Sequence, residues 1–99
     1  MSLRSVVYDH DFDNEANRIF GGARAADDAL RAVEFKLARE PDLSQYPETR
    51  VTALGPLRYI TTMATPTIPG VVVLFTHDDR IGRVCCHSIR ETVPRPFGS

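Results

Sequence analysis

Residues 70–90 read GVVVLFTHDDRIGRVCCHSIR, and their pattern of apolar and polar residues is the main evidence in the sequence for a β-sheet. The apolar run 71–75 has no alternation of polarity, which predicts a central strand that is either covered on both faces or packed against the helices. Residues 77–80, His-Asp-Asp-Arg, have the chemistry of a turn, and residues 81–89 then return as the partner strand. The segment therefore predicts a β-hairpin at the centre of a sheet.

Two more strands are expected immediately before this hairpin. Residues 50–54 and 57–64 alternate well enough for strands, and Gly55-Pro56 separates them. Residues 65–70 contain two prolines, which cannot donate hydrogen bonds to a ladder, and so predict a loop or bulge.

The N-terminal half has a helical period. After a short β-rich run at residues 4–8, apolar residues recur at helical spacing from Phe12 to Phe20, and Gly21-Gly22 ends this segment. A second helix is expected from Asp27 to Glu40, before Pro41. The apolar face of the second helix comprises Ala26, Leu30, Val33, Leu37 and Ala38.

The order of these elements predicts an α+β fold: an N-terminal strand, a helical hairpin and then an antiparallel β-meander with the hairpin packed on one face. A chain of 99 residues has room for one core, so we expect a single domain over residues 1–99. Its core is expected at about residues 6–91, followed by a flexible C-terminal tail that includes residues 94–97.

Composition narrows the possible environments. No apolar run approaches the roughly 20 residues that a membrane-spanning helix needs, and the first residues lack the apolar core of a signal peptide. Adjacent Cys85 and Cys86 cannot form an ordinary structural disulfide, which fits a reducing compartment. We therefore expect a cytoplasmic protein without a membrane partner.

Charge is unevenly distributed along the chain. The net charge is −1, but residues 1–49 carry 6 basic and 10 acidic groups, whereas residues 50–99 carry 6 and 3. Eleven of the twelve basic residues are arginine, which grips phosphate or carboxylate in a bidentate manner. An anionic partner on the C-terminal half remains open, while a general polyanion binder is disfavoured.

Three segments together resemble the RelE/ParE superfamily of bacterial type II toxins. They are the first strand leading into a helix, the amphipathic stretch ALRAVEFKLAREP at residues 29–41, and the closing hairpin at residues 70–90. The likeness covers about residues 6–91. It implies a small cytoplasmic toxin that a cognate antitoxin neutralises, and that either cleaves mRNA on the ribosome, as RelE-like members do, or poisons DNA gyrase, as ParE-like members do.

Strand alternation suggests which residues would carry ribonuclease chemistry. It places Arg83, Cys85, His87 and Ile89 on one face of the last strand, and Val84, Cys86, Ser88 and Arg90 on the other. If Val84 and Cys86 face the helices, Arg83 and His87 share the open face. RNA hydrolysis needs proton transfer and cations that stabilise the phosphorane-like charge. The catalytic candidates are His87 and Arg83, and the candidate phosphate contacts are Arg58 and Arg90.

Two other interpretations remain open. A gyrase poison of the same fold needs no proton-transfer residue. A non-catalytic interaction domain is favoured by the near-neutral charge, by Ile68-Pro69-Gly70 where such toxins often have arginine, and by the absence of their C-terminal tyrosine. In that case Arg83 and His87 are solvated strand residues or contacts for an antitoxin.

No metal site or cofactor is expected. Cys85, Cys86 and His87 are consecutive, and neighbouring strand residues diverge, so the three cannot converge on one ion. One cysteine is expected in the core and the other half-exposed. Residues 9–11, Asp-His-Asp, are interpreted as a capping or loop segment.

Overall fold

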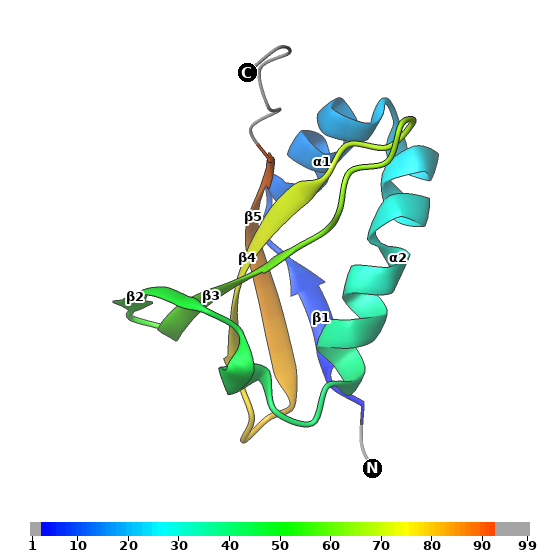
Figure 1. The fold of residues 1–99 in the computed structure, drawn as a ribbon. Coiled ribbons are helices and arrows are strands. Elements are labelled where there is room, and N and C mark those ends of the chain that lie inside the picture. The colour runs from blue at the N-terminus through cyan, green and yellow to red at the C-terminus, as the bar shows by residue number, and fades with distance from the viewer. Residues whose placement is uncertain (1–2, 93–99) are drawn as a thin grey trace.

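The computed structural model describes residues 3–92 and shows a five-stranded sheet with two helices on one face (Figure 1). The elements in chain order are β1 (Ser5–Tyr8), α1 (Phe12–Phe20), α2 (Ala23–Arg39), a 3-10 turn (Leu43–Gln45), β2 (Glu48–Thr52), β3 (Gly55–Thr61), β4 (Val71–Asp78) and β5 (Arg83–Glu91). The predicted α+β class is confirmed. The expected tail at residues 94–97 lies outside the described residues.

The sheet has the strand order β1-β5-β4-β3-β2. Strands β2 to β5 form the predicted antiparallel meander, and β4 lies at its centre as its apolar run indicated. Strand β1 pairs parallel to β5, so the five-stranded sheet is mixed. The reason is that α1 and α2 carry the chain from the β1 edge to the opposite edge, which leaves β1 to pair with the last strand.

The two helices follow the predicted pattern with one difference at their junction. Gly21 adopts φ 87°, a conformation that suits glycine, and its N–H donates to the Asn17 carbonyl, which ends α1. Helix α2 then begins at Ala23, four residues earlier than predicted, because Ala23, Arg24 and Ala25 are good helix formers that need no apolar contact. No helix within residues 3–92 is long and apolar enough to span a bilayer.

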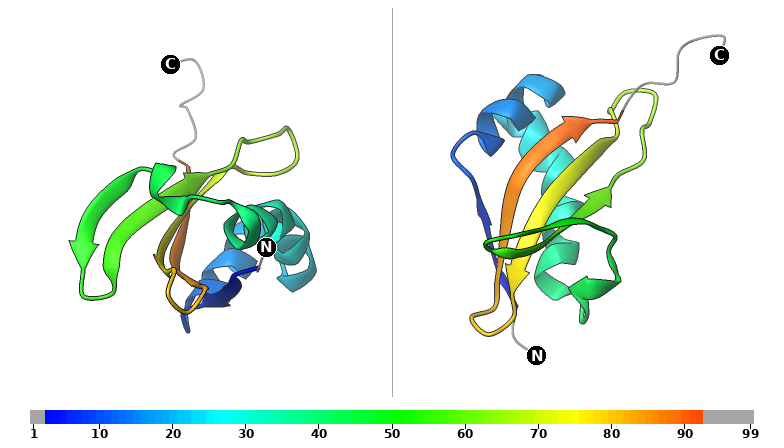
Figure 2. Two further views of the ribbon diagram at one scale, coloured as in Figure 1. Left: turned by 90° about the horizontal axis from the view of Figure 1, so that it is seen from below. Right: turned by 90° about the vertical axis from the view of Figure 1, so that its left-hand side faces the viewer.

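The core lies between the helices and one face of the sheet. Leu37 of α2 and Val71, Val73 and Phe75 of β4 are fully buried. The buried residues of α2 are Ala26, Leu30, Val33 and Leu37, as predicted, whereas Ala38, the fifth residue of the predicted face, is half-buried. Each large side chain buried in this way contributes about 1.5–3 kcal/mol to folding. The other face of the sheet carries no helix and is called the open face below (Figure 2).

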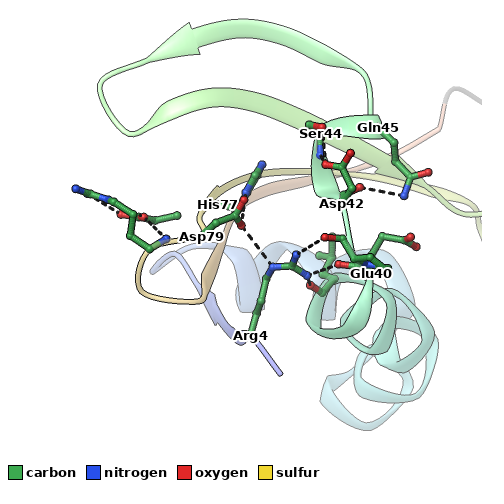
Figure 3. Close-up of polar contacts among 11 residues, drawn as sticks. Arg4, Glu40, Asp42, Ser44, Gln45, His77 and Asp79 are labelled. Atoms are coloured by element: carbon green, nitrogen blue, oxygen red, sulfur yellow. Dashed lines mark hydrogen bonds and ion pairs between the residues drawn. The ribbon is translucent and has the colours of Figure 1, made fainter. Parts of the chain in front are cut away.

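Arg4 links the start of β1 to the end of α2 and to the turn between β4 and β5 (Figure 3). Its guanidinium donates to backbone carbonyls at the end of α2, those of Leu37 and Pro41 at 3.3 Å and also that of Glu40. Its Nε lies 3.6 Å from Asp79 Oδ1 in the turn between β4 and β5. These contacts hold the start of β1 against both α2 and the hairpin, and so fix β1 beside β5.

Candidate functional site

The site begins with a β-bulge in β5. Phe75 of β4 pairs with Cys86, but the preceding Leu74 pairs with Ser88, which leaves His87 as an extra residue. Beyond this point the alternation of β5 is reversed. Ile89 is therefore buried in the core at 2% exposure and Arg90 is exposed. The predicted faces are correct as far as His87 and wrong for Ser88, Ile89 and Arg90.

The bulge gathers polar residues of β5 on the open face. Val84 and Cys86 are buried towards the helices, as the sequence suggested, so Arg83 and His87 do share the opposite face. Arg90 joins them there, because it pairs with Val72 while its neighbour Ile89 pairs with buried Val73. Three of the four predicted site residues therefore lie on one face of one strand: Arg83, His87 and Arg90.

Asp9 completes the site from the neighbouring strand. The parallel pairing of β1 with β5 sets Tyr8 beside Cys86, and the next residue, Asp9, donates its N–H to the Cys86 carbonyl at 2.9 Å. Its carboxylate reaches the bulged histidine, with 2.8 Å between Asp9 Oδ2 and His87 Nδ1. The segment 9–11, which the sequence suggested was a capping or loop segment, thus supplies a partner for His87.

The second ring nitrogen of His87 is also engaged. Its Nε2 lies 2.8 Å from Thr76 Oγ1 on the adjacent strand β4. Thr76 is only 3% exposed, whereas the Asp9 side chain is 47% exposed. The imidazole is therefore held between a buried hydroxyl on one side and an accessible carboxylate on the other.

Charge and burial set the protonation of the groups around His87. The hydrogen bond with His87 holds the pKa of Asp9 below its ordinary value. Burial raises the pKa of the Cys85 thiol, and so does the hydrogen bond that it donates to Asp9 Oδ1 at 3.5 Å. Burial raises the pKa of Cys86 to about 12. Both thiols are protonated at neutral pH, so neither is an activated nucleophile.

Arg58 is not brought to this site. It pairs with core residue Phe75, so its side chain lies on the helix face of the sheet. There it donates to the carbonyls of Ser44 at 3.2 Å and Tyr46 at 2.9 Å, and lies 3.8 Å from the Glu48 carboxylate. Its Nε is buried without a hydrogen-bond partner among residues 3–92. Arg58 therefore anchors the loop before β2.

Two hollows flank the site on the open face. One, of about 210 Å³, is lined by Leu54, Thr76, His77, Asp78, Ile81, Arg83 and Cys85. The other lies between His87 and the β2–β3 hairpin, which reaches away from the helices (Figure 2). A ligand in the second hollow would therefore contact His87, one member of the Asp9–His87 pair.

The geometry limits the chemistry that is available. A chain of carboxylate, imidazole and hydroxyl is the arrangement that activates a serine or threonine nucleophile. Here Thr76 is only 3% exposed, which disfavours direct attack of its hydroxyl on a substrate carbonyl. The pair can instead exchange a proton with a substrate that brings its own nucleophile, as the 2′-hydroxyl of RNA does.

Sequence reasoning missed Asp9 and Thr76. Thr76 is the first polar residue after the apolar run of β4. Because β4 is predicted to pair with the strand that carries His87, a polar residue at this position could have indicated a hydrogen-bond partner for the histidine. Asp9 carried no comparable signal, because its place depends on the parallel register between β1 and β5.

Comparison with known proteins adds no identification. No protein-family model matches the chain, and no curated protein matches it.

Proposed function

We propose that this chain is a RelE/ParE-like toxin that cleaves mRNA on the ribosome and is neutralised by a cognate antitoxin in the cytoplasm. The observation that carries the proposal is the Asp9–His87 pair on the open face, with the exposed residues Arg83 and Arg90 on the same strand. This combines a proton-transfer group with cations that suit phosphate.

In this mechanism the 2′-hydroxyl of RNA attacks the adjacent phosphorus, the P–O5′ bond breaks, and a cyclic phosphate forms. Both ring nitrogens of His87 have partners in the free protein, so the substrate must open one contact. The Asp9 contact is the accessible one, because Thr76 is buried. With the ring proton on Nε2 and donated to Thr76 Oγ1, an unprotonated Nδ1 takes the proton of the 2′-hydroxyl, the negative charge of nearby Asp9 stabilises the imidazolium, and water protonates the leaving oxygen.

Arg83 is proposed to stabilise the negative charge that develops on the oxygens of the reacting phosphate, and Arg90 to bind a neighbouring phosphate. The excess of basic groups in residues 50–99 supports an anionic partner on this half of the chain. The apolar rim of the open face, which includes Leu54 and Ile81 at 66% and 59% exposure, would serve the antitoxin.

A second candidate is a non-catalytic interaction domain of the same fold. It is favoured by the engagement of both His87 nitrogens and by the commitment of Arg58 to backbone carbonyls. In this case the open face binds a protein partner, and His87 and Asp9 only stabilise the bulge.

Inducible expression of the chain in a bacterium without any antitoxin tests the proposal. Growth arrest and new mRNA 5′ ends are expected for the natural chain, and both should be lost in His87→Ala and Asp9→Asn. His10→Ala is the matched control, because His10 is exposed and adjacent to Asp9 in sequence. Unimpaired growth would rule out a toxin.

Two other results would each identify an alternative. Growth arrest with DNA-damage signalling and intact transcripts would indicate a gyrase poison. Partner binding that persists in His87→Ala and Arg83→Ala, without transcript cleavage by the natural chain, would favour the interaction domain.

A further inference from the structure

Three different metal-ligating groups meet at the edge of β5. Within residues 3–92, Asp9, Cys85 and His87 each offer one ligand atom, and these atoms all lie within 4.8 Å of one another. Cys85 and His87 are two residues apart on the open face, and Asp9 directly follows the parallel neighbour β1. The expected divergence holds only for Cys86, which faces the core.

Two contacts of the Asp9 carboxylate approach the separations between ligands in a tetrahedral metal site. Ligands bound to zinc at about 2.0–2.3 Å are roughly 3.3–3.8 Å from one another. Here His87 Nδ1 lies 2.8 Å from Asp9 Oδ2, and Cys85 Sγ lies 3.5 Å from Asp9 Oδ1. The carboxylate needs only a small displacement to admit an ion, and its half-exposed side chain is free to make it.

The far side of the imidazole has the support that a metal-bound histidine requires. Such a ring donates its other N–H to an oxygen, which fixes the tautomer and aims the ligating nitrogen. Thr76 Oγ1, itself buried, lies 2.8 Å from His87 Nε2 and can accept that hydrogen bond. Nδ1 is then directed at Asp9 and away from the core.

We propose that Asp9, Cys85 and His87 bind Zn²⁺, with the fourth position open to water on the open face. Imidazole nitrogen, thiolate sulfur and carboxylate oxygen together are a ligand set that zinc accepts, and three protein ligands with one open position is its catalytic type of site. Cys85 releases its proton to solvent when the ion binds, and the resulting thiolate and the Asp9 carboxylate balance the two charges of the ion, which offsets repulsion from nearby Arg83. The proposal does not depend on RNA cleavage, and zinc on Nδ1 would block the proton transfer proposed above.

Cobalt substitution of the full chain tests this directly. Titration of the purified, metal-stripped protein with Co²⁺ should produce a thiolate-to-cobalt charge-transfer band in the near ultraviolet, and one equivalent of Zn²⁺ should remove it. Cys85→Ser should abolish the band, whereas Cys86→Ala should retain it, so that the adjacent cysteine serves as the control. His87→Ala and Asp9→Asn should weaken zinc binding at least tenfold, and Thr76→Val, which removes the support of the ring, about 10–100-fold.

Circular dichroism of each variant separates loss of the site from loss of the fold. Folded protein that gives no charge-transfer band with Co²⁺ would overturn the proposal. A band that survives Cys85→Ser, or one that disappears in Cys86→Ala while that variant remains folded, would overturn it as well. None of these three results changes what the growth and transcript tests show about RNA cleavage.

Discussion

The two adjacent cysteines show how much one position changes a side chain's surroundings. Cys86 is 1% exposed and packs in the core, while Cys85 is half-buried on the open face, where its thiol contacts Asp9. The sequence-based expectation of one core and one half-exposed cysteine is confirmed. Of the two thiols, only that of Cys85 is accessible to a ligand. Of their two ionisations, only that of Cys86 has a strong effect on the free energy of unfolding.

Burial of Cys86 predicts a loss of stability at alkaline pH. The folded pKa of about 12 lies above the ordinary value of 9.0, so the thiol ionises first in the unfolded chain. Its contribution is complete below pH 9 and is lost as the pH rises towards 12, by roughly 1 kcal/mol for each pH unit. Urea unfolding at pH 8, 9.5 and 10.5 measures this loss.

Cys86→Ala is the control for this effect, because the variant has no thiol at the buried position. It should be less stable than the natural chain at pH 8, and its stability should fall less steeply above pH 9. Cys85 and Tyr8, whose pKa values burial also raises, remain in both proteins. Parallel pH profiles of the two proteins would contradict the prediction.

At the scale of elements, the bulge in β5 explains both what the sequence predicted and what it missed. The period of α2 and the apolar run of β4 are local patterns, so these elements and their buried faces could be predicted. No residue type in the stretch Cys86-His87-Ser88 marks a bulge, so the faces of Ile89 and Arg90 could not. Register between strands is a tertiary property, and the position of Asp9 depends on it.

Deletion of His87 should preserve the fold. With the extra residue removed, Cys86 and Ser88 become neighbours and keep their pairing with Phe75 and Leu74. Regular alternation then leaves Val84, Cys86 and Ile89 in the core. We expect a change in unfolding free energy of about 1 kcal/mol or less, measured by urea denaturation, with loss of all chemistry that depends on the histidine.

Deletion of Cys85 is the matched comparison from the same strand. It moves Val84 to the open face and Arg83 into the core, because a one-residue slip reverses the faces of a strand. A buried, unpaired guanidinium costs several kcal/mol, a large part of the stability of a domain of this size. If this deletion were tolerated as well as that of His87, the assignment of the bulge would be wrong.

Across the whole molecule, stability and proposed function lie on opposite faces of one sheet. The helix face holds the core and the buried guanidinium of Arg58, whereas the open face holds Asp9, His87 and the exposed arginines. The sequence alone groups Arg58 with the site because the strand that carries Arg58 is expected to lie next to the hairpin. The face of the sheet on which the Arg58 side chain lies could be assigned only from the register of β3 with β4.

Paired arginine variants test this division. Arg58→Ala leaves the carbonyls of Ser44 and Tyr46 without their donor, so we expect it to lower the unfolding free energy by about 1–3 kcal/mol. Arg83→Ala, at an exposed position, should change it by no more than about 0.5 kcal/mol. RNA cleavage per folded molecule should show the reverse order: it falls in Arg83→Ala and is retained in Arg58→Ala. A stable Arg58→Ala protein that has lost cleavage would show instead that the helix face takes part in the reaction.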